Sequence, residues 1–138
     1  MSTSTSDRTR AIPTRAIIYW TATVLVVAEL IVGGLWDVAR LPFVRDTVTH
    51  LNYPTYFLVL LGVWKLLGAA ALLVPRAPLV KEWAYAGIIF VDSGAIVSHL
   101  TVGYARGEVA VLAVLAALTV VSWALRPPGR RIPPANPV

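Results

Sequence analysis

The segment TYFLVLLGVWKLLGAAALLVP, residues 55–75, decides the fold class, because it is a long apolar run interrupted only by Lys65. An α-helix needs about 20 mainly apolar residues to cross the hydrocarbon core of a bilayer. Three further runs of this kind lie at about residues 16–36, 83–103 and 109–125. The sequence therefore predicts an all-α integral membrane protein folded as a four-helix bundle over residues 16–125.

The composition supports a membrane protein. Of the 138 residues, 57% are hydrophobic and 14% are charged, whereas a soluble domain has about 25% charged residues. The chain has no cysteine, which excludes disulfides, thiolate nucleophiles and covalently attached haem within it. The net charge of +5 comes from basic residues that flank the apolar runs. Membrane topology explains such charges, so no nucleic-acid partner is expected.

The basic residues also predict the orientation. Residues 1–15 form a basic Ser/Thr-rich tail that we expect to be disordered, and residues 126–138 form a basic Pro-rich tail that we expect to be solvated. With four spans, both tails and the 76–82 loop share one side. That side carries Arg8, Arg10, Arg15, Arg76, Lys81, Arg126, Arg130 and Arg131, and the other carries Arg40, Arg45 and Arg106. Positive segments stay in the cytoplasm, so both termini are predicted to be cytoplasmic, in the inner membrane of a bacterial cell.

The connection between the first two runs, residues 37–54, is longer than a turn requires. Phe43, Val44, Val48 and Leu51 follow one another within it at intervals typical of one helix face. We therefore expect a short amphipathic helix on the membrane surface after the first span. An irregular loop with incidental hydrophobic residues is the alternative.

Four ionisable residues interrupt the apolar runs: Glu29, Lys65, Asp92 and His99. A charged side chain facing lipid at the bilayer centre costs roughly 2.5–3.5 kcal/mol on insertion scales. These residues should therefore face the interior of the bundle. Glu29, Lys65 and Asp92 fall at similar depths and are predicted to form one intramembrane charge cluster. Two carboxyl groups and one ammonium leave a net charge of −1, so one carboxyl group should be protonated or His99 charged.

Asp92 and His99 lie in FVDSGAIVSHL, residues 90–100. They are seven residues apart, about 700° around a helix, and so share one face. We expect both to line a cavity that opens toward the outer leaflet, with Asp92, Glu29 and His99 as candidate acid–base groups. The alternative is that Lys65 and Asp92 form an ion pair that only fixes helix register.

A metal centre is not expected. His50 and His99 are the two histidines of the chain, and both are predicted to lie on the outer side of the membrane. Their spacing matches no haem or metal motif, and cysteine ligands are absent. For His99 alone, contact with interfacial water is the alternative to a functional role.

Residues 50–103 resemble the DoxX-like family of small bacterial membrane proteins. The similarity is carried by HLNYP (50–54), GVWKLLG (62–68), KEWAYAG (81–87) and GAIVSHL (94–100). Around these segments it extends loosely over residues 17–125. Asn52 stands where the family pattern has glycine, and asparagine tolerates the same left-handed backbone.

The resemblance implies a four-helix membrane fold but no reaction. The family takes its name from a subunit of a thiosulfate–quinone oxidoreductase, and some relatives associate with redox proteins. One hypothesis is therefore an accessory or quinone-linked component that supports a redox partner. The alternative is a membrane-embedded binder or isomerase-like enzyme that acts on a lipophilic molecule through Glu29, Asp92 and His99. No cofactor motif is evident, a bound quinone is compatible with the first hypothesis, and the oligomeric state stays open.

Overall fold

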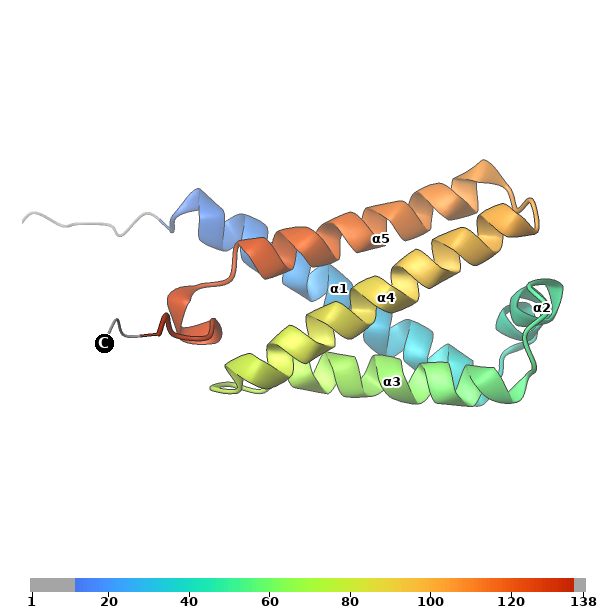
Figure 1. Cartoon of the computed structure of the whole chain (residues 1–138), viewed down its shortest axis with the longest axis horizontal. Coiled ribbons are helices and arrows are strands. Elements are labelled where there is room, and N and C mark those ends of the chain that lie inside the picture. The colour runs from blue at the N-terminus through green and yellow to red at the C-terminus, as the bar shows by residue number, and fades with distance from the viewer. Residues whose placement is uncertain (1–11, 136–138) are drawn as a thin grey trace, which may run out of the picture.

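Helices account for most of the chain in the computed structural model, which describes residues 12–135 (Figure 1). The elements are α1 (Thr14–Ala39), α2 (Pro42–His50), α3 (Tyr56–Leu73), α4 (Pro78–Thr101), α5 (Arg106–Ala124) and the short 3-10 helix η1 (Pro128–Arg130). The described residues contain no strand, so the predicted all-α class is confirmed. The predicted tail at residues 1–15 lies almost entirely outside the described residues.

The helices α1, α3, α4 and α5 are long and apolar enough to cross a membrane. Their outward surfaces carry large hydrophobic side chains. Trp83 and Phe90 on α4, for example, are each 74% exposed. Such a surface suits acyl chains rather than water. The chain is therefore a multi-pass membrane protein built as a helical bundle.

The four long helices form a ring. Helix α1 packs against α3 and α5, and α4 packs against α5 and α3, so that α1 lies diagonally opposite α4. Figure 1 shows α4 starting beside the end of α3 and then running away from it toward the start of α5. The pair α3 and α4 is thus close near its connecting loop and diverges farther along.

Glycine sets the close approach of α1 and α3. A Cβ added to Gly62 would lie 2.6 Å from the carbonyl oxygen of Gly34 and 2.7 Å from Cγ2 of Val38. Small residues commonly permit such contacts between membrane helices. Gly94 of α4 has no such role, because an added Cβ there would meet nothing within 4 Å.

A chain of buried hydroxyl groups links α1, α4 and α5. Thr23 donates to the carbonyl of Tyr19 at 2.7 Å, and the Thr23 and Ser122 oxygens are also 2.7 Å apart. The Tyr85 hydroxyl lies 2.7 Å from Ser122. Since the proton of Thr23 is used at Tyr19, Ser122 donates to Thr23 and Tyr85 donates to Ser122. Each of these three buried hydroxyl groups therefore has a hydrogen-bond partner.

Figure 1 places α2 at the end of the bundle opposite the C-terminal segment. It begins with Pro42 at its first position, where a missing N–H is harmless. Val48 is buried, whereas Phe43 is exposed and packs edge-on against Trp36 at 5.2 Å. The predicted helix in this connection is confirmed. Its place on the membrane surface stays a prediction.

The opposite end holds the start of α1 and η1 (Figure 1), and is called the terminal end below. Here Lys81 is buried and donates to the carbonyls of Ala71 and Leu72, each at 2.9 Å, and to that of Val74. Arg130 also donates to Leu72, at 3.1 Å. These cations satisfy the free carbonyls at the end of α3 and oppose its dipole.

The sequence predicts a solvated tail after α5. For the basic residues among residues 126–135, this prediction is wrong. Arg126 is buried and forms an ion pair with Glu82 at 2.5 Å. Arg131 donates to the carbonyls of Arg126 and Ala124, at 2.7 and 2.6 Å. Arg126 and Arg131, from which the orientation in the membrane is predicted, therefore also hold this segment against the bundle.

Candidate functional site

An ammonium group lies between two carboxylates at the contact of α1 and α3. Nζ of Lys65 is 3.2 Å from Oε1 of Glu29 and 3.2 Å from Oδ2 of Asp37. Glu29, Gly33 and Asp37 follow one another at four-residue intervals and so lie along one stripe of α1. Lys65 projects from α3 onto this stripe and connects the two helices electrostatically.

Gly33 makes room for this cluster. A Cβ added at this position would lie 2.9 Å from Oε1 of Glu29 and 3.0 Å from Nζ of Lys65. The absence of a side chain lets the ion pair settle against the backbone of α1. Gly33 is therefore part of the site, although it has no functional group of its own.

Asp37 was missed by the sequence analysis, and the partner assigned to Lys65 changes with it. The first span was expected to end at residue 36, which put Asp37 in a loop, but α1 continues to Ala39. Asp37 is only 4% exposed. Lys65 forms ion pairs with Glu29 and Asp37 and not with Asp92, so the alternative of a Lys65–Asp92 pair that fixes helix register is wrong. The four-residue spacing of Glu29, Gly33 and Asp37 is the signal that could have placed Asp37 on the same helix face as Glu29.

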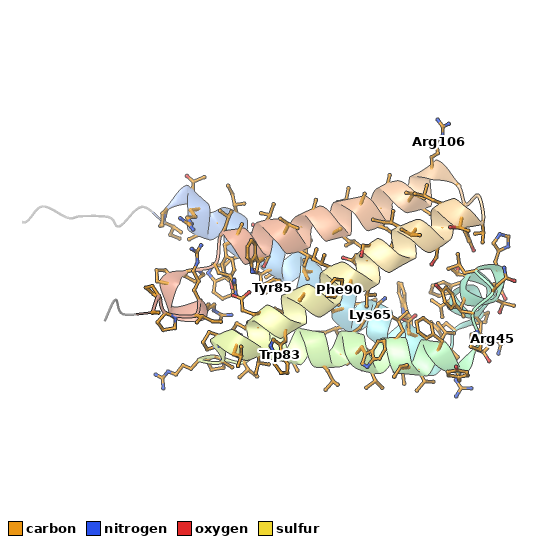
Figure 2. All side chains as sticks on the ribbon, viewed as in Figure 1. Arg45, Lys65, Trp83, Tyr85, Phe90 and Arg106 are labelled. Carbon is orange, nitrogen blue, oxygen red and sulfur yellow. The ribbon has the colours of Figure 1, made fainter. Side chains whose placement is uncertain are left out.

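A cavity of about 590 Å³ opens between α3 and α4. Its lining is Glu29 and Leu30 of α1, Trp64, Lys65, Leu67, Gly68 and Ala71 of α3, and Val80, Trp83, Ala84, Gly87, Ile88, Phe90, Val91 and Asp92 of α4. Figure 2 shows Trp83 and Phe90 along α4, with Lys65 between α4 and α3. The cavity is thus apolar apart from Glu29, Lys65 and Asp92, the three residues of the predicted charge cluster.

Asp92 has the least satisfied carboxyl group of this cavity. The residue is 9% exposed, and Oδ2 is buried without a hydrogen-bond partner among the described residues. A buried acceptor left without a partner costs about 1–3 kcal/mol. Asp92 therefore shares the cavity with Glu29 and Lys65, but its own hydrogen-bonding capacity is unused.

His99 lies outside this cavity. The lining extends from Asp92 toward Val80 and Trp83 at the terminal end, whereas His99 lies two turns from Asp92 in the other direction. The predicted cavity opening past His99 is therefore wrong. Nδ1 of His99 donates to the carbonyl of Ala95 at 2.8 Å, since a carbonyl can only accept.

The two histidines meet the same aromatic ring at the α2 end. The ring of Tyr104 lies 4.6 Å from that of His99 and 4.9 Å from that of His50. Nε2 of His99 is 3.9 Å from a carboxylate oxygen of Glu108. Within residues 12–135, no three potential ligands gather in a way that would hold a metal ion. Through Tyr104, these ring contacts join α2 to the end of α4.

The sequence model of the DoxX-like family matches residues 21–122, which cover α3 and α4, most of α1 and α5, and every residue that lines the cavity. The chain belongs to the DoxX-like family. A curated relative, the uncharacterized protein YdgD of Bacillus subtilis, is 33% identical over 75 residues. This match covers 51% of the present chain and 63% of YdgD, so the chain spans less than two thirds of that relative. No solved structure matches the chain.

In this DoxX-like protein, the charged residues of the cavity come from three helices. Glu29 is held by Lys65, and Lys65 is held in turn by Asp37. Asp92 can accept a hydrogen bond from a molecule in the cavity. The ion pairs of Lys65 lie beside it, and the rest of the cavity wall is apolar. The cavity is suited to binding a molecule that has a polar head and an apolar body.

Proposed function

We propose that this DoxX-like protein binds a lipophilic small molecule in the cavity between α3 and α4. The polar head would lie at Asp92, Glu29 and Lys65, and the apolar body along the walls. The observation that carries the proposal is the position of these three residues at an otherwise apolar cavity. Its volume of about 590 Å³ lies within the usual range of small-molecule sites.

The exposure of the cavity lining supports access from the membrane. Leu67 and Val80 are largely exposed, as are Trp83 and Phe90. In a bilayer, side chains on this outward surface face acyl chains. A lipophilic molecule can therefore enter between α3 and α4 sideways, without leaving the hydrocarbon phase.

A quinone-linked accessory role and acid–base catalysis both remain compatible with such a site. A membrane quinone has the apolar body that the walls would accept, which connects the site to the redox hypothesis. In an acid–base enzyme, Asp92 would transfer the proton. Glu29 is engaged by Lys65, and His99 lies outside the cavity.

Filling the cavity tests the proposal. Gly87 lines it and Gly94 does not, yet an added Cβ at either position meets nothing within 4 Å. Both glycines are exposed on α4, so Gly94→Leu is a matched control for Gly87→Leu.

The readout is native mass spectrometry of gently solubilised protein. We expect a lipophilic molecule to co-purify with the wild type and with Gly94→Leu, but to be lost from Gly87→Leu. A molecule retained equally by all three proteins would place binding elsewhere. If it is a quinone, the redox-linked role is favoured.

A further inference from the structure

We propose that the ligand of this cavity carries a positively charged, hydrogen-bond-donating head, as a long-chain primary amine does. This inference rests on the binding function proposed above and names the chemical class of the ligand. It follows from the charges around the cavity, from the engagement of Lys65 and from the free oxygen of Asp92.

The ionisable groups beside the cavity are unbalanced. Three carboxyl groups, those of Glu29, Asp37 and Asp92, accompany the single ammonium of Lys65. Their sum is −2 when all are ionised and −1 when one carboxyl group is protonated. In either case a cationic head reduces the net negative charge beside the cavity, and an anionic head increases it. Water screens charges poorly at such a site, so this difference matters.

Lys65 has little capacity left for an anionic or carbonyl head. Its ammonium group has three N–H donors, and carboxylates of Glu29 and Asp37 lie 3.2 Å away on two sides. A fatty acid or a quinone would have to compete with these carboxylates for the ammonium. Such a ligand would gain one hydrogen bond at most without breaking an ion pair.

Asp92 offers the complementary group. Oδ2 is a buried acceptor without a partner among the described residues, and Asp92 lines the cavity. A ligand ammonium would donate to this oxygen and form a charge-assisted hydrogen bond, which is stronger than a neutral one. This unpaired oxygen is an observation independent of the charge count, and it indicates that the site can accept a hydrogen bond from a donor on the ligand.

A competition series of three sixteen-carbon ligands and one quinone tests this inference. Wild-type protein in phosphatidylcholine nanodiscs would bind radiolabelled hexadecylamine, with hexadecanol, hexadecanoate and an isoprenoid quinone as competitors. We expect unlabelled hexadecylamine to compete at least about tenfold better than the other three, as expected for one buried charge pair. Equal competition by hexadecanoate or the quinone would overturn the inference.

Substitution of the carboxyl group gives a second measurement. Asp92→Asn should weaken hexadecylamine binding by about tenfold or more and leave hexadecanol binding unchanged. The matched control is Asp46→Asn, an exposed position on α2, which should alter neither. If Asp92→Asn fails to fold, the wild-type ligand series still decides. If neither hexadecylamine nor hexadecanol binds the wild type, the proposed function itself is wrong. If they bind equally well, the proposed function stands and this inference is wrong.

Discussion

Nζ of Lys65 lies 3.2 Å from Oδ2 of Asp37 and so joins the middle of α3 to the last turn of α1. The same ammonium lies 3.2 Å from Oε1 of Glu29. The two carboxylates are eight residues apart on α1, and a single lysine neutralises one charge of the pair. The stability of the α1–α3 contact and the charge beside the cavity therefore depend on one residue.

Loss of Lys65 should be partly rescued by loss of Asp37. Lys65→Met leaves the buried Asp37 carboxylate unpaired, which we expect to destabilise the protein by about 3–5 kcal/mol. In an Asp37→Asn background the same substitution should cost less. Thermal unfolding of the four proteins in detergent measures the cycle. Strictly additive effects would show that the two side chains do not interact.

Gly62→Ala should destabilise the bundle, because the new Cβ would lie 2.6 Å from a backbone oxygen of α1. Overpacking of this kind costs about 1–3 kcal/mol. Gly94→Ala, with nothing within 4 Å, should be neutral or stabilise α4 by up to about 1 kcal/mol. Apparent melting temperatures of the two variants provide the comparison. Equal losses at both sites would contradict the close approach of α1 and α3.

Ser122→Ala should destabilise the contact of α1, α4 and α5. The serine is fully buried, and its removal leaves the Tyr85 hydroxyl without an acceptor and Thr23 without a donor. Hydrogen bonds between membrane helices contribute about 0.6–2 kcal/mol. Ser93→Ala is the control, because Ser93 is exposed and bonds only within its own helix. In a Tyr85→Phe background, Ser122→Ala should cost less stability, as measured by thermal unfolding of the four proteins of the cycle.

His99→Asn should leave ligand retention unchanged, whereas Asp92→Asn should reduce it. The reason is that Asp92 lines the cavity and His99 packs against Tyr104 beyond it. Ligand content is measured by mass spectrometry on the purified variants. Loss of the ligand in His99→Asn, with the fold intact, would show that the site extends to the α2 end.

Both termini should be cytoplasmic. The distribution of basic residues along the sequence predicts this orientation, and Figure 2 shows Arg45 and Arg106 at the end of the bundle away from the C-terminal segment. Reporter fusions at residues 15, 78 and 130 should give cytoplasmic signals, and fusions at 46 and 105 should give external ones. Opposite signals at residues 15 and 130 would rule out this topology.

The shared depth of Glu29, Lys65 and Asp92 could be predicted, because the rise per residue fixes how far along a helix each residue lies. All three residues line one cavity, as their similar depth allows. The pairing within the cluster could not be predicted. It depends on which helices are neighbours and on how each is rotated, and neither quantity is contained in the spacing along one chain segment.

The sequence by itself determined that this is a four-span helical membrane protein. Runs of about 20 apolar residues have one stable solution in a bilayer, a helix that satisfies its own backbone. Only the tertiary structure decided that, within residues 12–135, Lys65 pairs with Glu29 and Asp37 and not with Asp92. The close crossing of α1 over α3 at Gly34 and Gly62 brings Lys65 onto the α1 stripe. The packing of α1, α3 and α4 also decides that Asp92 lines the cavity with an oxygen that has no hydrogen-bond partner among the described residues.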